Sequence, residues 1–171
     1  NAMTDDNRKI PAPAIDLSPV LGPSIRVTQE IKPAVPAKKF NIWPEPVWLI
    51  DLGQNMVGRV RLKVKVPAGR ILKLRFAEVL NPDGTIYVEN LRGIRAADYY
   101  TAKGDPAGEV WEPRFTFHGF RYVELSGHPE ELPADAIAGV VLHNDTPRTG
   151  DFTCNDPLIN QLQRNIDWGQ R

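Results

Sequence analysis

The sequence of 171 residues has very little cysteine, no excess of either charge and no long apolar run. Cys154 is the single cysteine, which excludes an internal disulfide and any zinc site built on several thiolates. No run of about 20 apolar residues could span a bilayer, and no basic start followed by an apolar stretch resembles a secretion signal. These absences give no support to a membrane partner, and they leave the cellular compartment open.

The charges balance, since lysine plus arginine and aspartate plus glutamate each number 21. A neutral chain gives no support to nucleic acid or an anionic membrane as a partner. Hydrophobic residues make up 42% of the sequence and charged residues 25%, as in ordinary globular domains that bury a core. The histidines, His118, His128 and His143, have no spacing that indicates a shared metal. No metal or other cofactor is therefore predicted.

Short apolar or alternating runs recur about every ten residues, with glycine and proline between them. This pattern predicts an all-β fold, an antiparallel β-sandwich or jelly roll. Strands are expected over residues 24–31, 47–52, 58–66, 71–78, 98–102, 111–125 and 136–143.

Two of these runs are expected to pair as a hairpin. Valine and leucine alternate with arginine and lysine over 58–66, the alternation resumes over 71–78, and Pro67-Ala68-Gly69 supplies a turn. The same phase places Glu78 on the inward side. A carboxylate there needs hydrogen-bond donors or a cation to offset its desolvation.

The stretch from Trp111 to Leu125 is expected to be one long central strand. Phe115 and Phe117 alternate in one phase, whereas Phe120 and Tyr122 alternate in the other. A β-bulge at Gly119 would return all four rings to the same core, because one extra residue resets the phase.

The last twenty residues change to a helical pattern. Asn155 or Asp156 is the expected N-cap, and Pro157 stands at the first helical position. Apolar residues then follow at helical spacing, namely Leu158, Ile159, Leu162 and Ile166. We expect a helix that begins a further domain, with its apolar side resting on the sandwich.

Glu78 has two interpretations. With Asn81 and Asp83 it would form a sugar or cation site, because hard cations take several carboxylate and carbonyl oxygens. Alternatively it pairs with an arginine and holds the loop that crosses between the sheets, since buried carboxylates are usually paired. In this second interpretation, the arginines that could pair with Glu78 are Arg92, Arg95 and Arg121.

Aromatic residues are candidates for stacking on sugars, since an amphipathic ring can meet the apolar face of a ligand. Trp43, which is followed closely by two prolines, is the best candidate for an exposed ring. Core packing is the stronger interpretation for Trp48 and Trp111, and Tyr99 is open to both. The candidate substrate-binding residues are Trp43, Glu78, Asn81, Asp83 and Tyr87.

Several stretches together resemble one known family. They are segments 51–58, 75–84, 87–92 and 111–123, followed near the C-terminus by 155–160 and 165–171. In this order they are similar to the concanavalin-like β-sandwich domain of bacterial α-L-rhamnosidases, glycoside hydrolase family 78, and to the opening helix of the catalytic domain that follows it. The resemblance runs from Ile25 to the C-terminus.

The resemblance implies a multidomain inverting hydrolase in which β-sandwich modules precede an (α/α)6 barrel. It divides the chain into a tag remnant and extended linker (1–24), a β-sandwich domain (25–150) and the truncated start of the catalytic domain (151–171). The acid and base of the family both come from the barrel, so no residue here is expected to be catalytic. The implied partner is that barrel, within the parent enzyme.

The expected function is therefore a non-catalytic accessory domain that packs on and supports a barrel hydrolysing terminal α-L-rhamnose. The alternative is a carbohydrate-binding module that recognises rhamnosyl glycans. An independent enzyme has no support, because the sequence shows no acid and base pair and no nucleophile arrangement.

Overall fold

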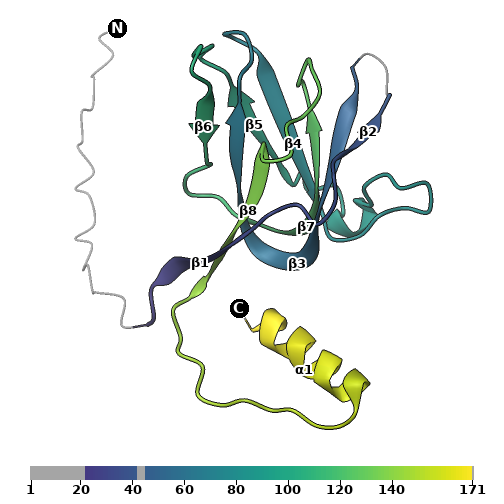
Figure 1. Cartoon of the computed structure of the whole chain (residues 1–171), viewed down its shortest axis with the longest axis vertical. Coiled ribbons are helices and arrows are strands. Elements are labelled where there is room, and N and C mark those ends of the chain that lie inside the picture. The colour runs from purple at the N-terminus through teal and green to yellow at the C-terminus, as the bar shows by residue number, and fades with distance from the viewer. Residues whose placement is uncertain (1–21, 42–44, 171) are drawn as a thin grey trace, which may run out of the picture.

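The structure is a computed structural model, and it describes residues 22–41 and 45–170. In chain order, these residues form β1 (Ile25–Ile31), β2 (Lys38–Phe40), β3 (Val47–Val64), β4 (Ile71–Ala77), the short 3-10 helix η1 (Glu89–Leu91), β5 (Ala97–Thr101), β6 (Glu109–Trp111), β7 (His118–Ser126), β8 (Ile137–Asn144) and α1 (Pro157–Gly169). Figure 1 shows the strands gathered together and α1 set apart from them. The predicted all-β class with one C-terminal helix is confirmed.

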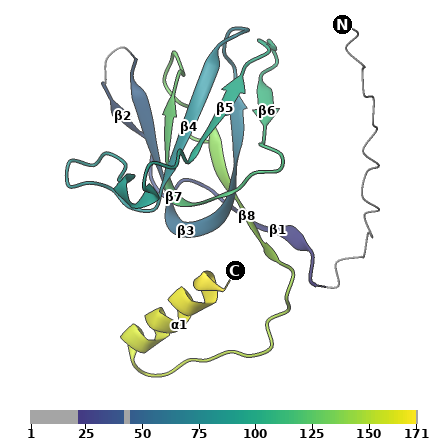
Figure 2. The ribbon, with the colours of Figure 1, turned by 180° about the vertical axis from the view of Figure 1, so that it is seen from behind.

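The long strand β3 belongs to both layers of the sandwich. The strand pairs are antiparallel, and neighbours follow the order β1-β8-β3-β7-β4-β5. The first part of β3 pairs with β2 and β7, and its last part pairs with β8 and β6. The sheet is therefore continuous in its hydrogen bonds and curls on itself along β3, whose bend lies at the foot of the strands in Figures 1 and 2.

A bulge in β3 accompanies this bend. The register of β3 with β7 shifts between Asp51 and Met56, and Gly53 within that interval has a φ of +75°. Glycine adopts a positive φ at little cost, and a bulge increases the local twist of a strand. The prediction of two separate strands, 47–52 and 58–66, is wrong because the chain bends at Gly53 without leaving the sheet.

The predicted hairpin between 58–66 and 71–78 is also wrong. Strands β3 and β4 both pair with β7, which lies between them. The expected turn is present, since the N–H of Arg70 donates to the carbonyl of Pro67 at 3.2 Å. It carries the chain from one layer to the other, so the alternation identified the two strands but not their partners.

The aromatic stretch from Trp111 to Leu125 is not one strand. It consists of the end of β6, an irregular segment and β7. Phe120 is fully buried as predicted, but Phe115 and Phe117 have relative exposures of 104% and 62%. The predicted bulge at Gly119 is wrong, because the bulge lies in β3 and the two exposed rings precede β7.

The core lies between the two layers, and β7 runs through its centre. Phe120 and Leu125 of this strand are fully buried, and Phe76 of β4 packs beside Phe120 with ring centroids 4.8 Å apart. Packing is tight enough to involve the backbone, since a methyl group on Gly58 would lie 2.1 Å from the carbonyl oxygen of Val140. The central position predicted for the aromatic stretch is thus confirmed for its second half.

Strands β1 and β8 bring the two ends of the sandwich together. Ile25 pairs with Asn144, and the N–H of Asp145 donates to the carbonyl of Ser24 at 2.9 Å. The strand predicted at 24–31 is present, but Ile25 and Val27 are exposed rather than half buried. This follows from the position of β1 at the edge of the sheet, where it has a single neighbour.

The predicted C-terminal helix begins as expected. Pro157 is its first residue, and the carboxylate of Asp156 accepts the N–H of Leu158 at 2.8 Å. The expected contact of its apolar side with the sandwich is wrong, because the four apolar residues have relative exposures between 45% and 79%. These residues are Leu158, Ile159, Leu162 and Ile166. Trp168, near the end of α1, does pack against the core.

Candidate functional site

A polar cluster at the bulge of β3 links the two central strands. Arg121 of β7 donates to Asp51 twice, from Nε to Oδ1 at 2.7 Å and from Nη2 to Oδ2 at 2.8 Å. Asp51 also accepts the N–H of Gly53 at 2.7 Å. The hydrogen bond from Arg121 is the main cause that lowers the pKa of Asp51, and it outweighs the opposing effect of burial. The carboxylate is therefore held ionised and anchors the bend.

The predicted inward position of Glu78 is wrong. Glu78 follows the end of β4, so the alternation no longer directs it, and its exposed side chain accepts a hydrogen bond from Nδ2 of Asn55 at 3.0 Å. In the part of the chain that the structure describes, no arginine forms an ion pair with Glu78, and Arg121 binds Asp51 instead. Asp51 thus takes one of the arginines expected for Glu78, and this pair joins β3 to β7 rather than holding the crossing loop. The available signal was a carboxylate inside an otherwise apolar run.

Asn81 and Asp83 build the turn over 81–84. Asp83 accepts the hydroxyl of Thr85 at 2.7 Å and its N–H at 2.9 Å, and these bonds lower the pKa of Asp83. Nδ2 of Asn81 donates to Oγ1 of Thr85 at 3.0 Å, while the N–H of Gly84 donates to the carbonyl of Asn81 at 2.9 Å. The polar atoms proposed for a ligand are therefore engaged within the turn.

The remaining candidates from the sequence, Tyr87 and the tryptophans, do not form a binding site together with this turn. The N–H of Tyr87 donates to the carbonyl of Val79 at 3.1 Å, so its backbone closes the hairpin that follows the turn. Trp43 lies outside the described residues. Trp48 is buried in the core, as predicted. The candidates that the structure describes thus form two groups, Glu78 with Asn55 and the turn itself.

A cleft of about 1040 Å³ lies beside the edge strands β5 and β6, and we call it the β5–β6 cleft. Tyr99, Trp111 and Phe115 line it with aromatic rings. Its charged lining residues are Arg59, Asp98, Lys103, Glu112 and Arg114. The cleft therefore combines apolar ring faces with charged groups, which is the composition of many ligand sites.

Buried Glu109 stabilises the floor of this cleft. The hydroxyl of Tyr100 donates to its carboxylate, and so do the N–H groups of Lys103 at 2.9 Å and Gly104 at 2.8 Å. The bond from Tyr100 is the largest cause that lowers the pKa of Glu109 to about 2, and the same bond raises the pKa of Tyr100 to about 12. Tyr100 stacks on Trp111 with ring centroids 5.1 Å apart. Sequence reasoning missed Glu109, although its place two residues before Trp111 in a strand puts both on one face.

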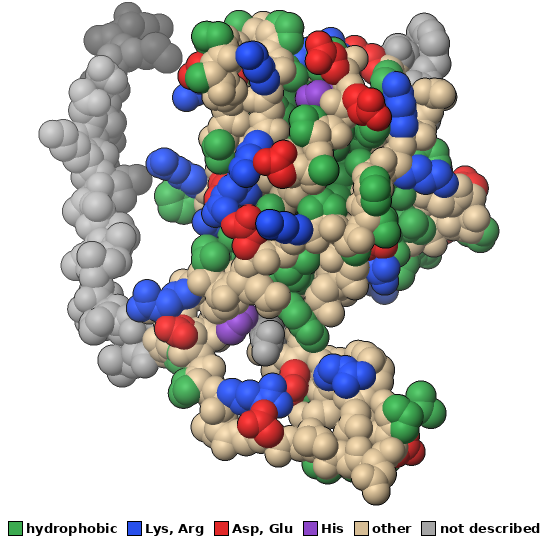
Figure 3. All heavy atoms as spheres, viewed as in Figure 1, with side chains coloured by type: hydrophobic (Ala, Val, Ile, Leu, Met, Phe, Trp, Pro, Cys, Tyr) green, Lys and Arg blue, Asp and Glu red, His purple; other side chains and the backbone are tan. Residues whose placement is uncertain are grey.

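Glu112 holds a second group of charges at the edge of the cleft. Its carboxylate accepts Nε of Arg59 at 2.9 Å and Nε of Arg61 at 2.6 Å, and Arg61 also pairs with Glu30 of β1. Burial would raise the pKa of Glu112, but the two arginines outweigh it and the pKa lies below its usual range. Figure 3 shows acidic and basic side chains gathered side by side on this view of the sandwich. Arg59 is therefore neutralised within the protein.

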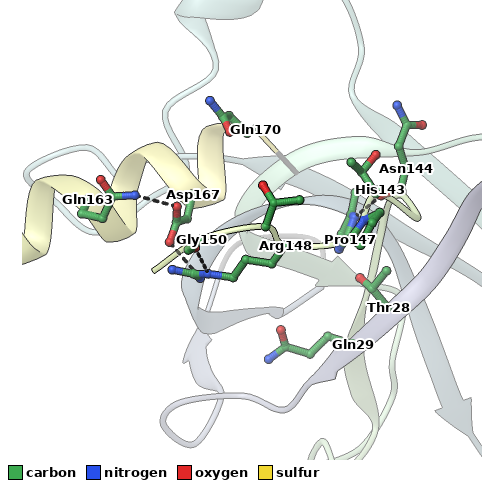
Figure 4. A pocket seen from close by; sticks show the side chains of 12 residues that line it. Thr28, Gln29, His143, Asn144, Pro147, Arg148, Gly150, Gln163, Asp167 and Gln170 are labelled. Atoms are coloured by element: carbon green, nitrogen blue, oxygen red, sulfur yellow. Dashed lines mark hydrogen bonds and ion pairs between the residues drawn. The ribbon is translucent and has the colours of Figure 1, made fainter. Parts of the chain in front are cut away.

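A second cavity, of about 710 Å³, lies between the sandwich and α1. Figure 4 shows Arg148 reaching from the connecting segment toward the helix. Its side chain donates to the carbonyl of Gly150 at 3.0 Å and pairs with Asp167 at 3.1 Å, while Gln163 donates to Asp167 at 3.0 Å. The polar side of α1 thus faces the cavity, and the hollow between α1 and the strands is visible in Figure 3.

His118 has a structural partner. Nε2 of His118 lies 3.0 Å from Oδ1 of Asp98, and its ring stacks on Phe76. Over residues 22–41 and 45–170, no three or more histidine, cysteine, aspartate and glutamate side chains are grouped so as to hold a metal ion. Over the same residues, no helix has both the length and the apolar character that crossing a membrane requires.

Comparison with known proteins connects this fold to one family. The family model for the bacterial alpha-L-rhamnosidase concanavalin-like domain matches residues 42–143. An alpha-L-rhamnosidase of Streptomyces avermitilis is 50% identical over 147 residues, which are 86% of this chain and 14% of that protein. An alpha-L-rhamnosidase of Formosa agariphila is 41% identical over 178 aligned residues, covering 100% of this chain and 19% of its own length.

Solved structures give the same relation. The Streptomyces avermitilis alpha-L-rhamnosidase complexed with L-rhamnose superposes with a TM-score of 0.79 at 49% identity, over 88% of this chain and 14% of that one. The alpha-L-rhamnosidase of Dictyoglumus thermophilum superposes with a TM-score of 0.79 at 40% identity, over 86% of this chain and 16% of that one. The chain thus spans less than a fifth of the length of these relatives.

Proposed function

The chain belongs to the family of concanavalin-like domains of bacterial α-L-rhamnosidases, and on this basis we propose that it is a non-catalytic domain that packs on and supports an (α/α)6 glycosidase barrel. In this proposal the whole enzyme removes terminal α-L-rhamnose from rhamnose-containing glycans. The sandwich occupies residues 25–150, and residues 151–171 lead into the barrel.

The observation that carries this proposal is the exposed apolar side of α1. Leu162 and Ile166 lie one turn apart on that side, and neither is covered by the sandwich. The polar side of the same helix is engaged with Arg148 through Asp167. A helix held by its polar side, with its apolar side open, is suited to pack against further helices, because burying that side removes apolar surface from water.

The sandwich adds a second apolar surface next to the end of this helix. Ile25, Val57 and Phe117 are exposed, and together with Gln170 of the helix end they line a cavity of about 230 Å³. A barrel that covers α1 would therefore meet apolar side chains from β1, β3 and the segment before β7. Because this apolar surface adjoins the end of α1, it supports one extended contact between the sandwich and the barrel, rather than a connection through the linker alone.

The carboxylates of the sandwich support placing the chemistry outside it. Inverting hydrolysis needs a carboxylic acid whose pKa is raised, so that it can give its proton to the leaving group, and a second carboxylate that activates water. Asp51, Glu109 and Glu112 all have pKa values lowered by donors that hold them ionised. Carboxylates held in this way serve as structural anchors.

The test is a pair of double variants with the same charge change. Leu162→Glu with Ile166→Glu places two carboxylates on the apolar side of α1, and Gln161→Glu with Asn165→Glu places them at the same spacing on an exposed polar side. In the 171-residue chain, both variants should keep the melting temperature of the sandwich. In the whole enzyme, only the first should lower the melting temperature and separate the unfolding of sandwich and barrel.

Two results would contradict the proposal. Equal melting temperatures for the two double variants in the whole enzyme would show that α1 does not pack through its apolar side. Hydrolysis of an aryl α-L-rhamnoside by the 171-residue chain, persisting after repurification, would show that the domain is itself catalytic.

A further inference from the structure

The β5–β6 cleft contains an aromatic residue in a costly position. Phe115 is fully exposed and has a φ of +61°, in the left-handed region that bulky residues avoid. Such a conformation costs on the order of 1–3 kcal/mol and is concentrated at ligand sites. Neither the core nor a turn requires this ring, because it projects from the irregular segment between β6 and β7.

The floor of the cleft, in contrast, is rigid. Trp111 is stacked on Tyr100, whose hydroxyl is held by buried Glu109, and Glu109 is held in turn by the backbone N–H groups that follow β5. Tyr99 is exposed, with Nζ of Lys73 5.8 Å from its ring centroid. A preformed floor lowers the ordering cost of binding. The cleft thus offers ring faces that are both accessible and fixed.

The cations of the cleft outnumber its carboxylates. Arg59 is neutralised by Glu112, and Asp98 lies 3.0 Å from Nε2 of His118, whereas Lys103 and Arg114 are exposed and have no acceptor for their side chains among the described residues. The lining therefore carries an excess of positive charge, with Arg59, Lys103 and Arg114 against Asp98 and Glu112. A ligand that fits both features has an apolar ring face and a negative charge.

We propose that the β5–β6 cleft binds a pyranose sugar that carries a carboxylate, as in an oligosaccharide containing uronic acid. The apolar face of the sugar ring stacks on Trp111 or Phe115, and the carboxylate lies between Lys103 and Arg114. This site is separate from the packing surface proposed above, since α1 and the residues beside it line other cavities. The two proposals can therefore fail independently.

The test follows backbone and indole N–H signals of the isotope-labelled 171-residue chain by NMR. The probes are a linear trimer of galacturonate and the neutral trimer of galactose, which match in ring number. The acidic trimer should give saturable shifts at the indole N–H of Trp111 and at the amides of Lys103 and Phe115. Its affinity should exceed that of the neutral trimer by roughly tenfold and should fall as salt is added.

Charge variants separate specific binding from a general attraction. Lys103→Gln with Arg114→Gln should lower the affinity for the acidic trimer roughly tenfold and leave the neutral trimer unchanged. The matched control is Lys32→Gln with Arg95→Gln, which removes the same charge from exposed positions outside the cleft and should have no effect.

Ring variants test the stacking. Phe115→Ala should weaken both trimers roughly tenfold, whereas Phe117→Ala, an exposed ring outside the cleft, should not. The proposal is overturned if neither trimer produces saturable shifts at millimolar concentration, or if the shifts lie outside the cleft. It is also overturned if the acidic trimer binds the Lys103 and Arg114 double variant as tightly as the original chain.

Discussion

Truncating Phe120 should remove a large part of the stability of the sandwich. Phe120 has no exposed surface and packs on Phe76 at 4.8 Å between ring centroids, tilted by 59°. Phe→Ala in a core costs about 3–5 kcal/mol. Domains of this size are stable by only about 5–15 kcal/mol, so Phe120→Ala should remove at least about a fifth of that free energy.

The matched controls come from the same aromatic stretch. Phe115→Ala and Phe117→Ala should each change the free energy of unfolding by less than about 0.5 kcal/mol, because both rings are largely in solvent. Phe115→Gly should stabilise the chain, since glycine accepts the φ of +61° without strain. The sequence alone placed all three phenylalanines in the core.

Urea unfolding followed by tryptophan fluorescence measures all four variants. With an m-value of about 2 kcal/mol/M, a loss of about 4 kcal/mol lowers the midpoint for Phe120→Ala by about 2 M. The midpoints for Phe115→Ala and Phe117→Ala should stay within about 0.3 M of the original chain. Equal losses from Phe117→Ala and Phe120→Ala would falsify the register of β7 described above.

Three further predictions concern the polar anchors and the packing. The lowered pKa of Glu109 means that its carboxylate stabilises the fold above pH 4.5, and that this stabilisation is lost as the pH falls from 4.5 to 2. Glu109→Gln should therefore flatten the fall of the melting temperature over that range. The same variant should remove the fall between pH 10 and 12 that the raised pKa of Tyr100 causes. Asp51→Asn should lower the free energy of unfolding in urea by about 1 kcal/mol. This loss is smaller than for a buried charged pair, because the side chain of Arg121 is 38% exposed. A loss near zero would contradict the anchoring role of Asp51. Gly58→Ala should cost about 3 kcal/mol, since its new methyl group would lie 2.1 Å from a β8 carbonyl oxygen, and an unchanged midpoint would contradict this close approach.

Local patterns predicted most of the elements. Alternation over 58–66 and 71–78 identified real strands, and Pro157 after Asp156 located the start of α1 to the residue. These signals work because the chemistry that sets a strand face or a helix cap lies within a few neighbouring residues. The pairing of strands depends on distant segments, so the insertion of β7 between β3 and β4 was not accessible from the same patterns.

The candidate site was harder to predict because side chains compete for the same partners. The pattern predicts an arginine partner for Glu78, but Arg121 gives both of its hydrogen bonds to Asp51 and Glu78 accepts from Asn55. The sequence predicts Asp83 as a candidate ligand, but Thr85 two residues later donates two hydrogen bonds to its carboxylate within the turn. The exposure of Phe115 depends on the break between β6 and β7, which no periodicity in the aromatic stretch indicated.

The pairing of Ile25 with Asn144 places the points where the chain enters and leaves the sandwich on neighbouring strands. The α-carbons of such partners are about 5 Å apart, so the whole sandwich joins the flanking chain at two neighbouring points, as a surface loop does. Gain, loss or exchange of the sandwich would therefore leave two ends that a short connection can join. A fold closed in this way is suited to be exchanged as a unit between chains of different length, without repositioning of the segments that flank it.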